Sequence, residues 1–411
     1  MNKIPRVKIY LSIKQLILSL FNDKKKSQSN IEIFFKQKLN KKNIIFTGMC
    51  RSAFMIILDY LKNTLPKKNE IIICAYNLKE MVDVARLKKF KIIFIDIDTQ
   101  TGLINTSKLT KLINPKTAAL LYTNMFNDHF ILKDLQYICK KNNILLIEDN
   151  AIYLGNYTNK ENKKVMAGSF GDVSLLSFGV MKNVSALFGG ALVTSNKSLA
   201  NFANKKINEY NNFPKMLYFK QIILFLTLKI LLSKFIYNYF FYYLIQIASS
   251  KQIMQIQKMI YPSMKFVKKK KLPISYYSKI SSTSIKIIDQ LLSDKNYYQN
   301  NIIRKKNNKN YFLRLKSIKN IKLFPFNDHN FQNLLDFPII VTDKKKLVDY
   351  LFKNGLEVRS YFYDNCDEIV GKITNYNSKY LEENLICLPS HSDINEKHIK
   401  QFSITIGNFY K

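Results

Sequence analysis

The chain has 411 residues, 47% of them hydrophobic, and carries a formal net charge of +36. Its length suits a large domain plus a smaller one, and its charge would fit nucleic acid or an anionic membrane surface. No helix-turn-helix, zinc-finger or RNP-like pattern accompanies the charge, so nucleic acid is not an expected partner. Five widely spaced cysteines favour free thiols in a reducing compartment. With four isolated histidines they offer no metal-site spacing, and no metal is expected.

The first 42 residues are expected to form a helical arm. Apolar spacing predicts a helix over residues 8–21, and the lysine run Asp23-Lys-Lys-Lys26 predicts a polar linker after it. The start of the chain does not read as a signal peptide, because Lys14 interrupts its apolar stretch and no small-residue cleavage site follows. A cytoplasmic location is therefore expected.

A strand and a helix come next, at Asn43-Ile-Ile-Phe-Thr-Gly-Met-Cys-Arg-Ser52 and residues 53–61. A helix that starts on such a turn presents free N–H groups and a positive dipole end to an anion. The alternative interpretation is an ordinary helix start capped by Ser52.

Short apolar runs then alternate with helical intervals, at residues 70–74, 91–96, 117–122 and 144–148. This alternation predicts a mostly parallel sheet buried on both faces. Because no strand ends in a glycine-rich Rossmann or P-loop fingerprint, nicotinamide and nucleoside triphosphate chemistry are not favoured.

Two chemically useful side chains follow. Ile144-Leu-Leu-Ile-Glu-Asp-Asn-Ala151 places Asp149 at the carboxyl edge of the sheet, where ligands of open α/β sheets bind. Lys182 lies in a turn between apolar runs, close to Gly189-Gly190, where desolvation would lower the pKa of its amine and make it a nucleophile or base. A solvated lysine at a strand end is the alternative. A lysine and an aspartate are the two groups that a pyridoxal phosphate (PLP) enzyme needs from its protein.

Taken in order, several motifs resemble the DegT/StrS-type aminotransferases, which are fold-type-I PLP enzymes acting mainly on nucleotide-linked keto-sugars. They are Gly48-Met-Cys-Arg-Ser-Ala, Ile-Glu-Asp-x-Ala, Gly168-Ser-Phe-Gly-Asp, Ser177-Phe-x-x-x-Lys and Gly189-Gly-Ala-Leu-Val-Thr. The resemblance runs from about Ile4 to the end of the chain. It implies an α/β fold whose mostly parallel central sheet is flanked by helices, with a smaller C-terminal α/β domain.

The resemblance also implies site roles. Lys182 would hold PLP covalently and then act as general base and acid, and Asp149 would keep the ring nitrogen protonated. Ser177 and the backbone amides of Cys50 and Arg51 would anchor the phosphate. Lysine at position 182 favours transamination, because a branch of the family carries histidine there and dehydrates its substrate.

This sequence departs from the family at two cofactor positions. Leu78 stands where many members stack an aromatic ring on the cofactor, and Ile152 stands where many have Gln or His. Tyr76 or Tyr153 could compensate for the first change. The departures leave the substrate open.

Residues 214–270 are expected to form a hydrophobic helical insert and a basic linker. Three interpretations of residues 216–248 remain open: helices buried against the sheet or in a dimer contact, an interfacial pair on a membrane, and a membrane-spanning pair. A charge-free stretch of 16 residues between Lys234 and Lys251 is short for spanning.

Residues 271–411 are expected to hold a long helix over 278–315 and a small domain. Its predicted elements are strands at 335–341 and 358–361 and a helix over 344–354. His391, in the family's Leu-Pro-x-His element, is expected to be positional. Arg359 is either a clamp for carboxylate or phosphate or a surface ion-pair residue.

These inferences divide the chain into residues 1–42, 43–213 (the PLP-binding domain), 214–270 and 271–411. They predict a PLP-dependent transaminase, homodimeric by resemblance, that moves an amino group from an amino acid such as glutamate to a nucleotide-linked keto-sugar in glycan biosynthesis. It would lie in the cytoplasm, free or at the inner face of the membrane, with 216–248 as the contact. Two alternatives remain: a non-sugar or lipid-linked carbonyl acceptor, and a non-enzymatic membrane-associated protein with a degenerate aminotransferase fold.

Overall fold

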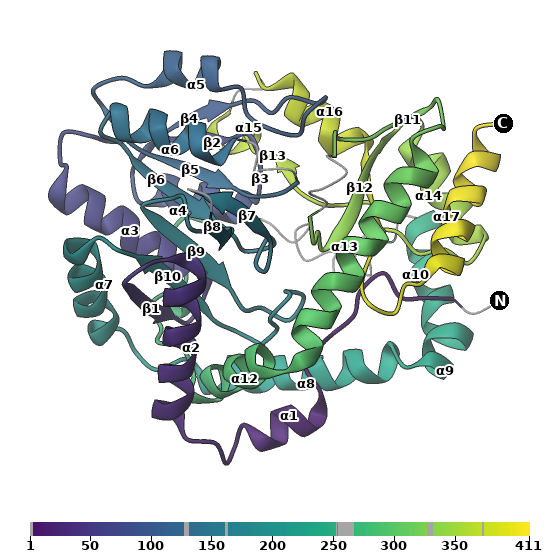
Figure 1. Cartoon of the computed structure of the whole chain (residues 1–411), viewed down its shortest axis with the longest axis horizontal. Coiled ribbons are helices and arrows are strands. Elements are labelled where there is room, and N and C mark those ends of the chain that lie inside the picture. Colours follow the sequence, from purple (N-terminus) through teal and green to yellow (C-terminus); the bar gives the residue numbers. More distant parts are fainter. Residues whose placement is uncertain are drawn as a thin grey trace.

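The computed structural model describes residues 3–126, 131–160, 163–251, 253, 267–326, 332–371 and 374–411. Figure 1 shows a large sheet with helices on both sides and a smaller sheet beside the long helix α13. The described strands are β1 (Asn43–Thr47), β2 (Glu70–Cys74), β3 (Tyr76–Asn77), β4 (Lys91–Ile95), β5 (Thr117–Thr123), β6 (Leu145–Asp149), β7 (Tyr157–Lys160), β8 (Lys163–Met166), β9 (Val173–Ser177), β10 (Gly190–Thr194), β11 (Ile321–Lys322), β12 (Asp336–Val341), β13 (Asp364–Asn365) and β14 (Leu385–Pro389).

Helices occupy most of the remaining described chain. They are α1 (Ile13–Leu18), α2 (Lys24–Leu39), α3 (Cys50–Thr64), α4 (Lys79–Leu87), α5 (Thr106–Leu112), α6 (Leu132–Lys141), α7 (Lys197–Glu209), α8 (Lys215–Leu231), α9 (Lys234–Ile236), the π-helix η2 (Tyr237–Phe241), α10 (Tyr242–Ser250), the 3-10 helix η4 (Ile274–Tyr276), α12 (Ser282–Ser293), α13 (Lys295–Leu315), α14 (Lys344–Lys353), α15 (Asp367–Val370), α16 (Tyr376–Asn384) and α17 (Glu396–Phe409).

The large sheet has the strand order β1-β10-β9-β6-β5-β2-β4. Strands β4, β2, β5, β6 and β9 are mutually parallel, and β10 is antiparallel to both of its neighbours. Helices α3, α4 and α7 bury one face of the sheet, and α5 and α6 cover part of the other. Because both faces are buried, the strands read as continuous apolar runs, and the predicted fold class is confirmed.

The N-terminal arm differs from its prediction. Helix α1 covers only Ile13–Leu18, because Ser12 and Gln15 form a capping box that starts it there. Ile9 and Leu11 are buried in a segment without helix or strand before it. The predicted linker after Asp23 is wrong, since this side chain accepts a hydrogen bond from the Lys26 N–H and begins the 16-residue helix α2.

Two predictions for the C-terminal part are also wrong in detail. The long helix is broken at Asp294, whose side chain caps α13 through the Asn296 N–H. Residues 358–361 form no strand. Arg359 alone pairs with the β14 residue Cys387, through two backbone hydrogen bonds of 2.9 Å that form an isolated bridge.

Within the described residues, no single helix is both long and apolar enough to cross a bilayer. Helix α8 and the helical run from Lys234 to Ser250 satisfy these criteria only when taken together, and the chain bends by 67° between them.

Candidate active site

The carboxyl ends of β6 and β9 bring the predicted site residues to one edge of the sheet. Asp149 is the last residue of β6 and Ser177 the last of β9. The turn after β9 carries Lys182 and returns along β10, whose first residue, Gly190, lies opposite Ser177. Asp149 and Lys182 therefore lie on adjacent strand ends although 33 positions separate them in the sequence.

Asp149 is 3% exposed, and its burial raises the pKa of its carboxyl. One carboxylate oxygen accepts a hydrogen bond from the Ala151 N–H at 2.9 Å, and the other lies 3.5 Å from the Thr123 hydroxyl. Thr123 also accepts a hydrogen bond from the Asn77 amide at 3.1 Å. Asn77 and Thr123 were not predicted, although both are polar residues at strand ends, Thr123 on β5 of the large sheet and Asn77 on β3, which follows β2.

The amine of Lys182 lies close enough to Asp149 for each charge to affect the other. Burial lowers the pKa of Lys182, and the positive charges of Arg359 and Arg51 add to that effect. The negative charge of Asp149 acts in the opposite direction. The structure thus gathers Lys182, Asp149, Cys50 and Arg51 from three elements, and the low pKa favours the reactive neutral amine.

Helix α3 begins at this cluster without a side-chain cap. Its N-cap residue is Met49, so the alternative that Ser52 caps the helix is wrong. Among the described residues, the buried Ser52 hydroxyl has no hydrogen-bond partner. A Cβ on Gly190 would lie 2.3 Å from the Cys50 nitrogen, so only glycine allows β10 to approach the helix start this closely.

Leu78 is the N-cap residue of α4, and its N–H donates to the Asn77 side chain at 2.7 Å. It packs against the apolar clusters on both faces of the sheet. Tyr76 and Tyr153 are each 1% exposed. Their hydroxyls bond within the core, where Tyr153 donates to the Phe126 carbonyl and Tyr76 accepts from the Tyr363 N–H.

A small cavity beside Lys182 has four arginine or lysine neighbours of that lysine in its walls, Arg6, Lys8, Arg304 and Arg359. Asp336, His391 and apolar side chains complete the lining. The Arg359 guanidinium also lies 3.0 Å from the Asp336 carboxylate. Arg359 thus forms an ion pair that is largely buried instead of lying at the surface, and it also lines the cavity. Its role as a clamp stays a prediction.

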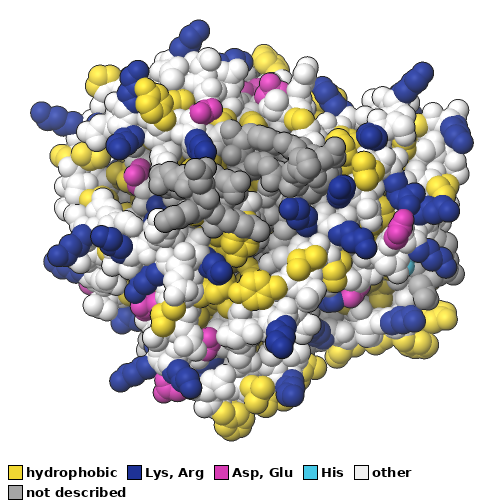
Figure 2. Space-filling model, viewed as in Figure 1, with side chains coloured by type: hydrophobic (Ala, Val, Ile, Leu, Met, Phe, Trp, Pro, Cys, Tyr) yellow, Lys and Arg dark blue, Asp and Glu magenta, His cyan; other side chains and the backbone are white. Residues whose placement is uncertain are grey.

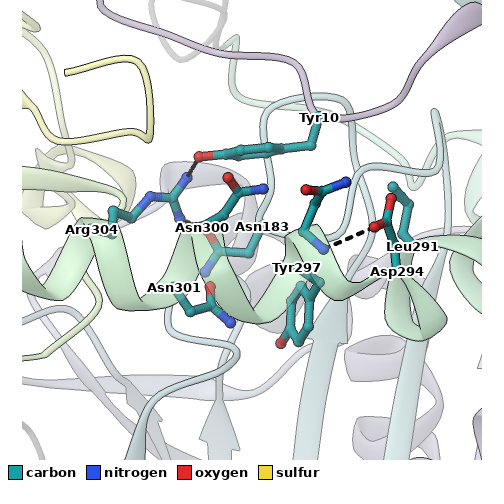
Figure 3. A pocket seen from close by; sticks show the side chains of 9 residues that line it. Tyr10, Asn183, Leu291, Asp294, Tyr297, Asn300, Asn301 and Arg304 are labelled. Atoms are coloured by element: carbon teal, nitrogen blue, oxygen red, sulfur yellow. Dashed lines mark hydrogen bonds between the residues drawn. The ribbon is translucent and has the colours of Figure 1, made fainter. Parts of the chain in front are cut away.

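An adjoining polar pocket joins the N-terminal segment, α13 and the lysine turn (Figure 3). Arg304 of α13 donates to the Tyr10 hydroxyl at 2.6 Å and to the side chain of Asn183, the residue after Lys182. Sequence reasoning missed these three residues. Arg304 is 3% exposed in a helix rich in Lys and Asn, where neither periodicity nor composition marks one buried cation.

His391 contacts the N-terminal segment. Its Nε2 lies 2.8 Å from the Pro5 carbonyl oxygen, and its Nδ1 lies 3.3 Å from the Asp393 nitrogen. Burial lowers the pKa of His391 to about 4. A neutral ring between two backbone groups agrees with a positional role.

No group of three His, Cys, Asp or Glu side chains in the described parts of the chain is arranged to hold a metal ion. His129 and His329 lie outside the described residues.

The model of the DegT/DnrJ/EryC1/StrS aminotransferase family matches residues 12–212. A UDP-4-amino-4,6-dideoxy-N-acetyl-beta-L-altrosamine transaminase of Helicobacter pylori is 25% identical over 190 residues, which are 45% of this chain and 49% of the relative. GDP-perosamine synthase of Escherichia coli O157:H7 is 25% identical over 175 residues, which are 42% of this chain and 47% of the relative. The chain thus spans about half the length of these curated relatives.

Solved structures share the fold over the whole chain. Helicobacter pylori PseC, an aminotransferase involved in pseudaminic acid biosynthesis, has a TM-score of 0.74 at 16% identity, covering 100% of this chain and 99% of its own. Escherichia coli GDP-4-keto-6-deoxy-D-mannose-3-dehydratase with bound hydrated PLP has a TM-score of 0.70 at 17% identity, covering 99% of this chain and 100% of its own.

Proposed function

This chain belongs to the DegT/DnrJ/EryC1/StrS aminotransferase family, and we propose that it is a PLP-dependent transaminase. It would transfer an amino group from an amino acid, with glutamate as the expected donor, to a nucleotide-linked keto-sugar in glycan biosynthesis. The names of the curated relatives support this acceptor class. The observation that carries the proposal is the half-buried Lys182, whose amine has a lowered pKa, close to the buried carboxyl of Asp149.

The residues present fit PLP. Lys182 offers an amine of lowered pKa to the aldehyde, and Asp149 offers a carboxyl for the ring nitrogen. The uncapped start of α3, with the amides of Cys50 and Arg51 and the unpartnered Ser52 hydroxyl, suits a phosphate. Ser177, on the strand end opposite Gly190, completes the proposed phosphate contacts.

When bound, PLP supplies a ring that accepts electrons from the carbon that loses a proton. Lys182 would attach the cofactor, give way to the donor amine, and then move the proton from the donor Cα as base and acid. Asp149 would hold a proton at the ring nitrogen. Leu78 would present an apolar surface to the ring in place of an aromatic one.

The arginine and lysine side chains in the wall of the cavity beside Lys182 support an anionic substrate. Arg359 and Arg304 lie beside Lys182, where guanidinium groups could bind the carboxylate of the donor or the phosphates of a nucleotide sugar. We assign Arg359 the direct contact, because its side chain is 20% exposed and its charge reaches Lys182, whereas Arg304 is 3% exposed and bonds Tyr10 and Asn183.

The proposal includes a homodimer in the cytoplasm, with a large PLP-binding domain at residues 43–213 and a smaller domain at 271–411. It also includes contact of residues 216–248 with the inner face of the membrane. The exposed side chains of α8 to α10 support that contact.

The test is the absorption spectrum of the purified protein with added PLP, before and after borohydride. We expect a yellow band that borohydride removes, that Lys182→Ala lacks and that the exposed control Lys197→Ala keeps. Absence of the band from the folded wild type would overturn the proposal and favour a non-enzymatic role. Amino transfer to nucleotide-linked keto-sugars, compared with other carbonyl compounds including lipid-linked ones, then identifies the acceptor class.

A further inference from the structure

Helices α8 to α10 leave one side uncovered, and we call the exposed side chains on it the apolar face. Their exposed fractions lie between 36% and 66%. The members are Met216, Phe219, Ile223, Leu224, Leu226, Ile230, Phe235, Tyr239, Phe240, Tyr243, Leu244 and Ile247. Hydrophobic side chains line the lower right edge of the molecule in Figure 2, where Figure 1 places the end of α8 and α9. A monomer rarely exposes so many large apolar side chains on one segment without a partner.

The opposite side of the same helices is fixed to the protein body. Phe225 is fully buried in the cluster shared with β1, β9 and β10. The Tyr237 hydroxyl donates to the Glu357 carboxylate at 2.5 Å, and Gln246 donates to the Phe352 carbonyl at 3.1 Å. The helices therefore lie along the surface of the body and direct the apolar face outward.

The charge of this region has one sign. No Asp or Glu occurs between Glu209 and Asp289, whereas that stretch holds 13 lysines. Among them Lys215, Lys220, Lys234 and Lys251 are exposed on or beside the helices that carry the apolar face. The partner that covers this face must therefore be apolar at its centre and negative around it.

We propose that the apolar face docks on the surface of a bilayer that contains anionic lipids, with α8 to α10 lying in the plane of the interface. Apolar side chains of such a helix enter about 5–10 Å into the boundary between headgroups and acyl chains. Lysines meet the anionic headgroups, and tyrosines suit the headgroup level. This inference rests on the membrane contact included in the proposed function and specifies its lipid chemistry and geometry, but it does not depend on the proposed catalytic activity.

A second copy of the chain fits this face less well. Apposing two such faces would bring lysines of both copies together, and the segment supplies no acidic side chain to pair with them. Membrane insertion as a spanning pair would require the contacts of Phe225, Tyr237 and Gln246 with the body to break.

The first experiment tests the apolar side chains. The full-length protein is mixed with vesicles of phosphatidylcholine containing about one third phosphatidylglycerol, and the bound fraction is measured by flotation. We expect the triple variant Phe219→Ser, Phe235→Ser, Phe240→Ser to bind at least about tenfold more weakly than wild type. The matched control Tyr137→Ser, Tyr376→Ser, which removes exposed aromatic rings from α6 and α16, should bind like wild type.

The second experiment tests the charge. Lys220→Glu, Lys234→Glu should weaken flotation with the anionic vesicles, whereas Lys108→Glu, Lys111→Glu on α5 makes the same change in net charge and should weaken it much less. Pure phosphatidylcholine vesicles should bind wild type far more weakly than the anionic ones.

Three results would overturn the inference. They are no flotation of the wild type, equal binding to neutral and anionic vesicles, and equal loss in the test and control variants. Sedimentation velocity distinguishes the competing partner. If the wild type is a dimer, the triple variant is a monomer and both bind vesicles equally, the apolar face is an interface between copies.

Discussion

Glu148 and Asp149 are neighbouring buried carboxylates with different surroundings. Glu148 accepts hydrogen bonds from the N–H groups of Gly168, Phe170 and Gly171 and from the Asn124 amide, at 2.6–3.1 Å. The Gly-Ser-Phe-Gly motif thus wraps around Glu148, a structural role that the sequence did not reveal. Asp149 keeps one oxygen with only a long contact to Thr123 and faces Lys182.

The two acids should therefore respond differently to amide substitution. Glu148→Gln places an NH₂ group among donors and should lower the free energy of unfolding by about 2–3 kcal/mol. Asp149→Asn should change it by less than about 1 kcal/mol and reduce the proposed transaminase activity at least about 100-fold. Urea unfolding followed by circular dichroism and a transamination assay measure the two effects, with exposed Glu383→Gln as the control. Equal stability losses would contradict this division of roles.

His391 makes stability depend on pH. Burial lowers its pKa from 6.5 to about 4. Between pH 6.5 and pH 4, His391 is therefore protonated in the unfolded chain and neutral in the folded chain. The contribution of the neutral His391 to the free energy of unfolding is complete above pH 6.5. It is lost as the pH falls toward 4, by up to about 3 kcal/mol. Asp393, Asp336 and Arg304 are the charged groups that influence it.

Comparing the unfolding of wild type and His391→Gln at several pH values between 7.5 and 4.5 tests this. The glutamine can still donate to the Pro5 carbonyl and does not titrate, so the variant should lose less stability on acidification. If the free energy of unfolding falls equally with pH in the two proteins, His391 is not the cause of the loss in acid.

At the scale of elements, the apolar runs predicted the parallel strands because both faces of the sheet are buried. Strands β2, β4, β5 and β6 each lie within one residue of the predicted bounds. Helix α2 was missed because its four buried residues, Ser27, Ile31, Phe35 and Leu39, recur every fourth position among many lysines. The prediction followed the run of lysines and not that spacing. Packing of these four residues against the rest of the protein stabilises the helix.

The α2 cap offers a direct test at this scale. Asp23→Ala removes the hydrogen bond to the Lys26 N–H and should lower the free energy of unfolding by about 1 kcal/mol. Asp134→Ala, at an exposed first-turn position of α6 where the residue is not the cap, should cost less. Thermal unfolding followed by circular dichroism compares them. Equal losses would indicate a general charge effect rather than capping.

At the scale of the whole molecule, the sequence predicted Lys182 and Asp149 because motifs with characteristic neighbours mark them. Tyr10, Arg304 and Arg6 could not be predicted in the same way. Each reaches the region of the site from a segment far away in the chain, and only the tertiary fold brings those segments together.

A buried ion pair joins three such segments. Arg6 bonds the Glu357 carboxylate at 3.1 Å, Tyr237 donates to the same group, and the Arg and Glu side chains are 4% and 3% exposed. Arg6→Met leaves Glu357 without its counterion and should cost about 3–5 kcal/mol. Adding Glu357→Gln should recover at least half of the free energy of unfolding that Arg6→Met loses.

Far-UV circular dichroism suits this comparison, since the chain has no tryptophan. A double variant less stable than Arg6→Met would mean that the carboxylate is stabilised by Tyr237 and backbone groups alone.

The place of β1 at one end of the large sheet bears on how the protein is made. Its neighbour in that sheet is β10, which leaves the ribosome about 140 residues later. At about 5–20 residues per second, the nascent β1 waits roughly 7–30 seconds for its partner. Because β10 also closes the lysine turn, the start of α3 and Lys182 come together only in the same late step of synthesis.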